Sequence, residues 1–273
     1  MSYPFGRVIV ITGASSGIGL ACAEAFARKG FSVWALSRRA DGPIKQVGEG
    51  CIRPLACDVC DDQSVQAAAA HILAAGDRVG TILHCAGFGI SGAADDTPLD
   101  AARAQMETNY FGVLRVNRAF LPLLRDGGGG LVLVMGSMAG LVPIPFQSHY
   151  SSTKFALEAY TEALRMEGRA FGLRACIIEP GDTKTGFTDA RQPTLPEDSP
   201  YADACRRAVD RMAADERKGH PPEKVARVVL RVAQKKNPPV RRAVGLSYKA
   251  FVLIRRLLPA RLVDWMLSVK YLK

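Results

Sequence analysis

The chain has 273 residues, of which 48% are hydrophobic and 23% charged, and its formal net charge is +10. These values are typical of a folded globular protein and exclude a disordered chain, a collagen-like repeat or a small disulfide-built domain. No run approaches the roughly 18 apolar residues of a membrane span, and the first residues lack a signal-peptide pattern. We therefore expect one domain, 1–273, in the cytoplasm.

Short apolar runs alternate with helical patterns along the first two-thirds of the chain. The runs predict strands at 7–12, 32–36, 52–57, 81–85, 131–135 and 173–178, with a last one at 240–244. The patterns between and after them predict helices at 17–29, 61–75, 99–124, 149–171, 201–218 and 223–235. This alternation indicates an α/β fold with a parallel sheet covered on both faces.

A glycine-rich turn lies between the first predicted strand and the first predicted helix. Its sequence, Thr-Gly-Ala-Ser-Ser-Gly-Ile-Gly, occupies residues 12–19. Glycines allow close approach to a pyrophosphate, and the helix that follows offers free amides and a positive dipole end. The turn therefore predicts a dinucleotide site. Its candidate cofactor residues are Gly13, Ser15, Ser16, Gly17, Ile18 and Gly19.

The end of the second predicted strand indicates which dinucleotide binds. An acidic residue there would favour NAD, but the chain has Ser37 followed by Arg38 and Arg39. A guanidinium suits a 2′-phosphate. We therefore expect NADP(H), with Arg38 as the first choice of ligand and Arg39 as the second. The alternative is a solvated basic turn without a ligand.

Tyr150 and Lys154 lie four residues apart, on one face of a predicted helix. A free tyrosine has a pKa near 10, and a neighbouring ammonium favours the phenolate and lowers that value. The pair is therefore a candidate acid/base device. Taken alone, such a pair is more often part of an amphipathic helix that carries a surface lysine.

Over roughly residues 7–187 the chain resembles the short-chain dehydrogenase/reductase family. The resemblance lies in the order and spacing of five features: the glycine turn, Asn109, Ser137, Tyr150 and Lys154. The resemblance implies a single-domain Rossmann fold, a doubly wound parallel sheet of about seven strands. It implies that Tyr150 exchanges a proton with the substrate oxygen, while Lys154 lowers the pKa of Tyr150 and holds the nicotinamide ribose. Ser137 would hydrogen-bond the substrate oxygen, and Asn109 would hold a water that relays protons.

The same resemblance implies further cofactor contacts and shows one departure. The family usually has Asn-Asn-Ala-Gly after the fourth strand, where this chain has His84-Cys-Ala-Gly. The missing asparagine puts the local support of the sheet in doubt, and we expect His84 to be a structural residue. The additional cofactor residues implied are Asp58, Val59, Ala86, Gly87, Pro180, Gly181, Thr183 and Thr185, together with Tyr150 and Lys154.

The segments expected to line a substrate pocket are apolar. They are 88–90, 138–146 and Phe187, the last within a predicted loop or lid at 182–220. Residues 140–158 are similar to the 17β-hydroxysteroid and retinol dehydrogenase branch of the family. The resemblance implies interconversion of a ketone and a secondary alcohol on a steroid, retinoid, ketosphinganine or other long-chain lipid. The alternatives are a generic carbonyl reductase and a non-catalytic NADP-binding regulatory or peripheral membrane protein.

The charge is concentrated in the last fifth of the chain. Residues 220–273 carry a net charge of +11, and residues 1–219 carry −1. Within 247–273, basic residues alternate with apolar ones around Pro259, which predicts two short amphipathic helices. They suit an anionic membrane surface, packing on their own domain, or a dimer mate; we do not expect nucleic acid as a partner. The family resemblance implies a homodimer or homotetramer.

Seven cysteines occur without regular spacing, and Cys57 and Cys60 form a C-x-x-C pair. A redox or zinc pair would need a helix N-terminus or a second ligand pair nearby in sequence. Neither is present, so we expect structural cysteines and no metal site.

Overall fold

The structure, a computed structural model, describes residues 3–40 and 42–272. Residues 1, 2 and 273 of the predicted domain 1–273, and residue 273 of the predicted tail segment 247–273, lie outside the described residues. Within the described residues, eight strands form one sheet in the order β10-β8-β7-β5-β1-β2-β4-β3. All neighbours described in this sheet pair in parallel except β3, which is antiparallel to β4. The strands are β1 (Val8–Thr12), β2 (Ser32–Ser37), β3 (Lys45–Val47), β4 (Gly50–Ala56), β5 (Thr81–His84), β7 (Gly130–Met135), β8 (Leu173–Pro180) and β10 (Arg241–Val244).

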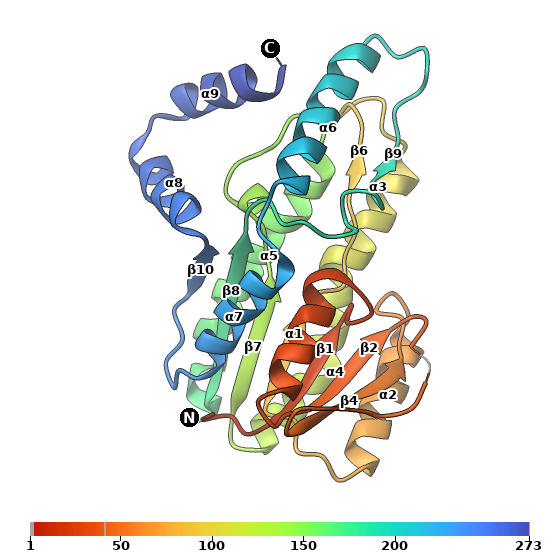
Figure 1. The fold of residues 1–273 in the computed structure, drawn as a ribbon, viewed down its shortest axis with the longest axis vertical. Coiled ribbons are helices and arrows are strands. Elements are labelled where there is room, and N and C mark those ends of the chain that lie inside the picture. The colour runs from red at the N-terminus through yellow and green to blue at the C-terminus, as the bar shows by residue number, and fades with distance from the viewer. Residues whose placement is uncertain (1–2, 41, 273) are drawn as a thin grey trace.

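Helices cover both faces of this sheet (Figure 1). On one face, Phe26 and Val229 are buried against strand residues such as Ile9. On the other face, Phe120 is buried against residues that include Val10. The first face carries α1 (Gly17–Ala27) and α7 (Pro222–Ala233); the second carries α2 (Asp62–Ala74), α4 (Gly112–Asp126) and α5 (Ser148–Glu167). The predicted doubly wound α/β fold is confirmed.

Two features of the central sheet and its helices differ from the sequence prediction. The predicted helix 99–124 is divided into α3 (Leu99–Met106), a π-helical turn (Glu107–Phe111) and α4. The edge strand β3 was missed because Lys45 and Gln46 are polar and exposed, so the strand has no apolar alternation.

The remaining elements lie above and beside the carboxyl ends of the strands (Figure 1). The two predicted tail helices, interrupted at Pro259, are present, and the described residues contain no helix long and apolar enough to cross a membrane. These elements are a small parallel pair, β6 (Ile90–Ser91) and β9 (Gln192–Pro193), and the helices α6 (Ala202–Arg217), α8 (Leu246–Leu257) and α9 (Ala260–Leu272).

The strand order determines where a ligand can bind. β1 lies between β2 and β5, so the winding of the sheet reverses at β1. In doubly wound sheets, ligands bind at the carboxyl ends of the strands beside such a reversal. Here that edge carries the glycine turn after β1 and the segment after β5.

Candidate active site

The glycine turn is packed so closely that larger residues do not fit. Gly13 has a φ of +66°, and a Cβ placed there would lie 2.6 Å from the backbone nitrogen of Ala86. A Cβ at Gly19 would lie 2.2 Å from the carbonyl oxygen of Gly13. The turn after β1 therefore lies directly against the segment after β5, and both glycines are required for this contact.

The start of α1 is open to an anionic ligand. Ser16 is the N-cap, with extended backbone, and its side chain makes no capping hydrogen bond. Ser15 and Ser16 are exposed, while Gly17 and Ile18 are partly exposed. The first turn of α1 contains no acidic residue, so no carboxylate opposes a phosphate at this positive helix end.

The residues predicted to bind the adenosine half lie at the ends of β2 and β4. Ser37 ends β2, and Arg38 and Arg39 after it are exposed; no ion pair to either arginine occurs among the described residues. After β4, Asp58 Oδ1 accepts a hydrogen bond from Cys60 N (2.9 Å), which holds a tight turn. Val59 is buried there, and a Cβ at Gly112 would lie 2.9 Å from its Cγ2.

The segment after β5 is secured without the family's asparagine. The hydroxyl of Thr12 accepts from the backbone nitrogens of Cys85 (3.2 Å) and Ala86 (3.3 Å). His84 is buried, and its Nε2 is 2.9 Å from Asn117 Oδ1. Burial lowers the pKa of His84 to about 4, so the ring is neutral at pH 7. Thr12, which the sequence analysis did not single out, thus supports the strand ends, and His84 is a structural residue.

Tyr150, Ser137 and Lys154 converge at the carboxyl end of β7. The side chain of Ser137 lies near Tyr150 and acts to lower its pKa. Ser137 Oγ accepts a hydrogen bond from Ala139 N (3.1 Å). The Nζ of Lys154 donates to the Met135 carbonyl (2.8 Å) and lies 5.6 Å from the centroid of the Tyr150 ring. The α5 spacing therefore places Tyr150 and Lys154 near each other, at the carboxyl end of β7.

Burial is the largest influence on the pKa of Tyr150 in this structure. Burial raises the pKa of Tyr150 to about 12, and the neighbouring Ser137 side chain only partly opposes this rise. Burial also lowers the pKa of Lys154 to about 8. The Nζ of Lys154 donates to a backbone carbonyl here, and the predicted lowering of the Tyr150 pKa by Lys154 stays a prediction. Tyr150 in this state is a protonated donor.

Asn109 acts on the backbone after β5. It lies in the π-helical turn, is buried, and its Oδ1 accepts from Phe88 N (3.0 Å). Its Nδ2 donates to Phe88 O (3.0 Å) and to Thr153 Oγ1 (3.2 Å). The side chain is thus occupied in positioning the segment that precedes Gly89. The predicted water relay through Asn109 stays a prediction.

The predicted lid contacts both halves of the site. A Cβ at Gly17 would lie 3.5 Å from Thr185 Cβ, so the lid reaches the glycine turn. The rings of Phe187 and Tyr150 have centroids 5.6 Å apart, and a Cβ at Gly89 would lie 3.0 Å from Phe187 Cζ. Phe187 therefore forms an apolar cover over the tyrosine.

The base of the lid is attached to the tail. Tyr248, at the start of α8, donates from its hydroxyl to Asp182 Oδ2 (2.6 Å) and accepts from Asp182 N (2.9 Å). Its ring lies on Gly181, where a Cβ would be 2.0 Å from Tyr248 Cζ. Thr183 Oγ1 donates to the Gly181 carbonyl (2.9 Å). The buried Pro180 ends β8 immediately before this turn. Sequence reasoning missed Tyr248 because 66 residues separate it from its partner.

The two cysteines of the C-x-x-C pair are structural. Burial raises the pKa of Cys57 to about 11 and also raises the pKa of Cys60. Cys60 Sγ lies 3.2 Å from Thr108 Oγ1. Both thiols are therefore protonated at neutral pH and poorly suited to metal binding or nucleophilic chemistry.

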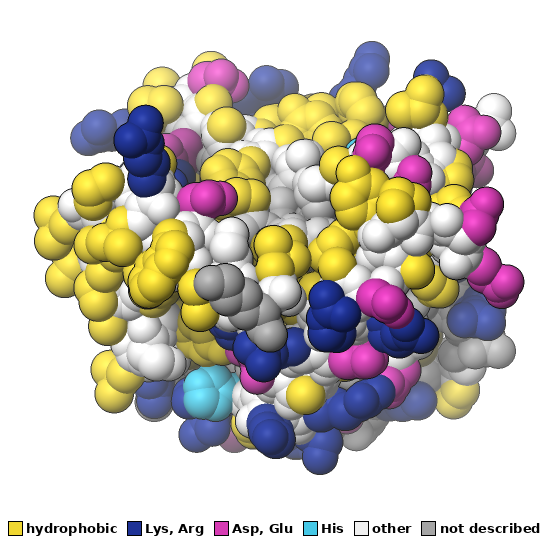
Figure 2. Space-filling model, turned by 90° about the horizontal axis from the view of Figure 1, so that it is seen from above, with side chains coloured by type: hydrophobic (Ala, Val, Ile, Leu, Met, Phe, Trp, Pro, Cys, Tyr) yellow, Lys and Arg dark blue, Asp and Glu magenta, His cyan; other side chains and the backbone are white. Residues whose placement is uncertain are grey.

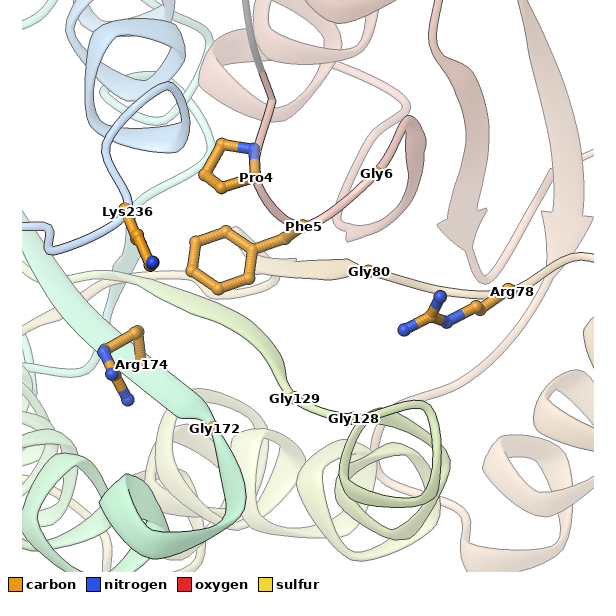
Figure 3. A pocket seen from close by; sticks show the side chains of 10 residues that line it. All are labelled: Pro4, Phe5, Gly6, Arg78, Gly80, Gly128, Gly129, Gly172, Arg174 and Lys236. Carbon is orange, nitrogen blue, oxygen red and sulfur yellow. The ribbon is translucent and has the colours of Figure 1, made fainter.

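A cavity of about 320 Å³ lies at the opposite, amino-terminal edge of the sheet. Figure 3 shows Arg174 and Lys236 on one side of Phe5 and Arg78 on the other. Arg78 Nη2 donates to the Gly127 carbonyl, and Arg174 Nη1 donates to the Leu173 carbonyl (2.8 Å). These arginines satisfy backbone acceptors at helix and strand ends, which accounts for their positions without a ligand.

Comparison with known proteins identifies the family. The sequence model of the short chain dehydrogenase family matches residues 7–196. A 3-ketodihydrosphingosine reductase of Bacteroides thetaiotaomicron is 34% identical over 268 residues, covering 97% of this chain and 98% of that protein. The dehydrogenase/reductase SDR family member 7B of Danio rerio is 33% identical, covering 93% and 82%. A short-chain dehydrogenase structure from Streptomyces avermitilis superposes with a TM-score of 0.79 at 29% identity, covering 96% and 97%.

The chain belongs to the short-chain dehydrogenase/reductase family, as predicted. It is an oxidoreductase that acts on alcohol and carbonyl groups, and its family uses a nicotinamide cofactor.

Proposed function

We propose that this protein is an NADP(H)-dependent oxidoreductase that interconverts a ketone and a secondary alcohol on a lipophilic substrate. The observation that carries the proposal is the half-buried Tyr150, which lies beside Ser137 and against the ring of Phe187. A substrate oxygen placed beside these two hydroxyls would receive a proton in an apolar setting from which the lid excludes water.

The residues at the strand ends fit a dinucleotide. The glycine turn forms a cradle that a Cβ at Gly13 or Gly19 would fill, and Ser16 begins a helix with an uncapped side chain. Arg38 and Arg39 would hold the 2′-phosphate. Asp58 and the neighbouring Val59 would contact the adenine, and Lys154 would hold the nicotinamide ribose. Ala86, Gly87, Pro180, Gly181, Thr183 and Thr185 complete the proposed cofactor contacts. When bound, the nicotinamide supplies or accepts the hydride at the reacting carbon.

The protein's own groups then handle the proton. In the reducing direction, Tyr150 donates its hydroxyl proton to the substrate oxygen, and Ser137 keeps that oxygen within reach. Tyrosine is protonated at neutral pH, so Tyr150 carries the proton that this step needs. The buried ammonium of Lys154, 5.6 Å from the ring centroid, favours the phenolate that remains after transfer.

The apolar walls support a lipophilic substrate. Ile90 and Val142 are buried near the site's loops, and Phe187 presents an aromatic face to Tyr150. Pockets with few polar groups select apolar ligands. The Bacteroides relative, named for a long-chain lipid ketone, points to a substrate of the same class.

The cellular setting is part of the proposal. All seven cysteines are free, as expected in a reducing cytoplasm. A homodimer or homotetramer remains the expected assembly, on the family resemblance alone.

Cofactor titration tests the first half of the proposal. We expect NADPH to bind more tightly than NADH, and Arg38→Ala to weaken NADPH at least tenfold while leaving NADH unchanged, because a charge-assisted contact contributes about 1.5–3 kcal/mol. Arg125→Ala, an exposed arginine at the far edge of the sheet, is the matched control. Equal loss for both dinucleotides, or tighter NADH, would show that the Ser37–Arg38 turn does not select NADP(H).

Tyr150→Phe tests the second half. We expect turnover of a long-chain ketone to fall about 10²–10⁴-fold, because the proton donor is lost, while NADPH affinity changes little. Unchanged turnover would exclude Tyr150 as the acid. Retained biological effect with abolished turnover would favour a non-catalytic, regulatory role.

A further inference from the structure

The C-terminal helices α8 and α9, here called the tail helices, leave one face of each helix unpartnered. On α8, the exposed residues Leu246, Leu253, Ile254 and Leu257 follow a spacing of i, i+7, i+8 and i+11, which lies on one side of a helix. On α9, Leu262, Trp265, Met266 and Leu272 are exposed with a similar helical spacing. Figure 1 places the tail helices beyond the β10 edge of the sheet, and apolar side chains gather on that side in Figure 2.

These helices are held on the body by specific contacts, so their exposed faces are not frayed ends. Tyr248 anchors the start of α8 to Asp182 by the two hydrogen bonds described above. At the end of α9, Lys270 pairs with Asp215 of α6 (3.0 Å), and its carbonyl accepts from Arg211. Val263 is buried, on the inner side of α9. The tail helices therefore present two apolar stripes on a fixed support.

The charges around the stripes are of one sign. Residues 246–272 contain five lysines and arginines and a single carboxylate, Asp264. Lys249 and Arg261 are exposed next to the stripes. Beneath α8, a hollow of about 230 Å³ is lined by Leu141, Val252 and Arg255, together with the β10 residue Arg241. The Nε of Arg255 is buried without a hydrogen-bond partner among the described residues.

We propose that the tail helices bind the surface of an anionic phospholipid bilayer, with the apolar stripes in the headgroup boundary and the basic residues on lipid phosphates. Apolar faces that carry tryptophan and are flanked by cations have this property, and each cation near an anionic surface strengthens the binding. The charge argues against a second copy, because a two-fold interface would set the same basic face against itself. Arg255 is suited to a phosphate that enters the hollow.

The tail helices lie next to the predicted substrate segment, so membrane binding would bring the site close to lipid substrates. Leu141 follows the turn that Ser137 caps, so the hollow under α8 borders the predicted substrate segment. A lipophilic substrate dissolved in the bilayer would be delivered next to this segment. This purpose rests on the proposed function, whereas membrane binding itself is measured without turnover and stands or fails separately.

Tryptophan fluorescence gives a direct test, because the chain has two tryptophans in opposite environments. Trp34 is 4% exposed and donates to Asp77 Oδ2 (2.8 Å), whereas Trp265 is 58% exposed. The full chain is mixed with vesicles of phosphatidylcholine alone or with added phosphatidylglycerol. We expect a blue shift, quenched by brominated lipid, only with phosphatidylglycerol, and its loss at high salt. Trp265→Phe should still co-sediment with the vesicles but show no shift.

Charge substitutions separate the tail stripes from other exposed apolar residues. Leu253→Glu combined with Leu257→Glu should lower vesicle partitioning more than about tenfold, because burial of each leucine is lost. Leu99→Glu is the matched control, an equally exposed leucine on α3, and should leave partitioning within about twofold of the parent. Lys249→Glu should lower partitioning about fivefold or more. NADPH binding by each variant reports that the domain is folded.

Two results would overturn the proposal. The first is the absence of a shift with phosphatidylglycerol vesicles, or an equal loss of partitioning in Leu99→Glu and the tail variants. The second is sedimentation of the parent as a dimer that Leu253→Glu/Leu257→Glu converts to a monomer, without vesicle binding by either. That outcome would identify the stripes as a subunit interface.

Discussion

The contact of Tyr248 with Gly181 predicts a large coupling between the tail and the base of the lid. A Cβ at Gly181 would lie 2.0–2.3 Å from three atoms of the Tyr248 ring. The ring cannot shift aside and keep both hydrogen bonds to Asp182, because they hold the hydroxyl on one carboxylate and one backbone nitrogen (2.6 and 2.9 Å). Gly181→Ala therefore displaces the ring and breaks both bonds.

The expected cost follows from these two bonds. A hydrogen bond to a charged group contributes about 1.5–3 kcal/mol and a neutral one about 0.5–1.5 kcal/mol. Gly181→Ala should therefore lower the free energy of unfolding by about 2–4 kcal/mol. Tyr248→Ala should cost a similar amount. In the Tyr248→Ala background, Gly181→Ala should be nearly neutral, because the atoms it would meet are gone.

Equilibrium urea unfolding of the parent, both single variants and the double variant measures this coupling. Gly186→Ala is the matched control in the same loop, since a Cβ there meets nothing within 4 Å, and it should change stability by less than about 1 kcal/mol. The packing argument would be refuted if the losses of unfolding free energy simply add in the double variant. It would also be refuted if Gly181→Ala lowers the free energy of unfolding no more than Gly186→Ala does.

Three other outcomes are expected. Burial lowers the pKa of His84 to about 4, so between about pH 4 and 6.5 the unfolded chain binds a proton at His84 that the folded chain does not. The free energy of unfolding should therefore rise by about 3 kcal/mol as the pH increases through this range. His84→Gln should flatten this part of a profile of urea midpoint against pH. Burial raises the pKa of Glu158 to about 8, so between about pH 4.5 and 8 unfolding releases the proton of this side chain. The free energy of unfolding should therefore fall as the pH rises through this range, and Glu158→Gln should remove this dependence on pH. Gly19→Ala meets the Gly13 carbonyl at 2.2 Å and should weaken NADPH binding at least roughly tenfold in a titration, whereas retained affinity would contradict the cradle geometry.

Much of the fold could be predicted from the sequence because its signals are local. The all-apolar strand β7 and the capped helix α2 are each encoded within a dozen residues. The glycine turn and the Tyr150–Lys154 spacing are equally local, and their positions after a strand and on a helix are confirmed. Where local signals were weak, prediction failed: β3 has exposed polar residues, and the π-helical turn around Asn109 has no distinctive composition.

The sequence by itself thus determined the order of strands and helices, the turn that can hold a phosphate, and the pair Tyr150 and Lys154. Only the tertiary structure determined the hydrogen-bond partners and the pKa values of those groups. It directs Lys154 at the Met135 carbonyl, raises the pKa of Tyr150 by burial, and supports Cys85 through Thr12. These effects join residues far apart in the chain, because desolvation and hydrogen-bond partners are set by packing, and no local pattern of residues records them.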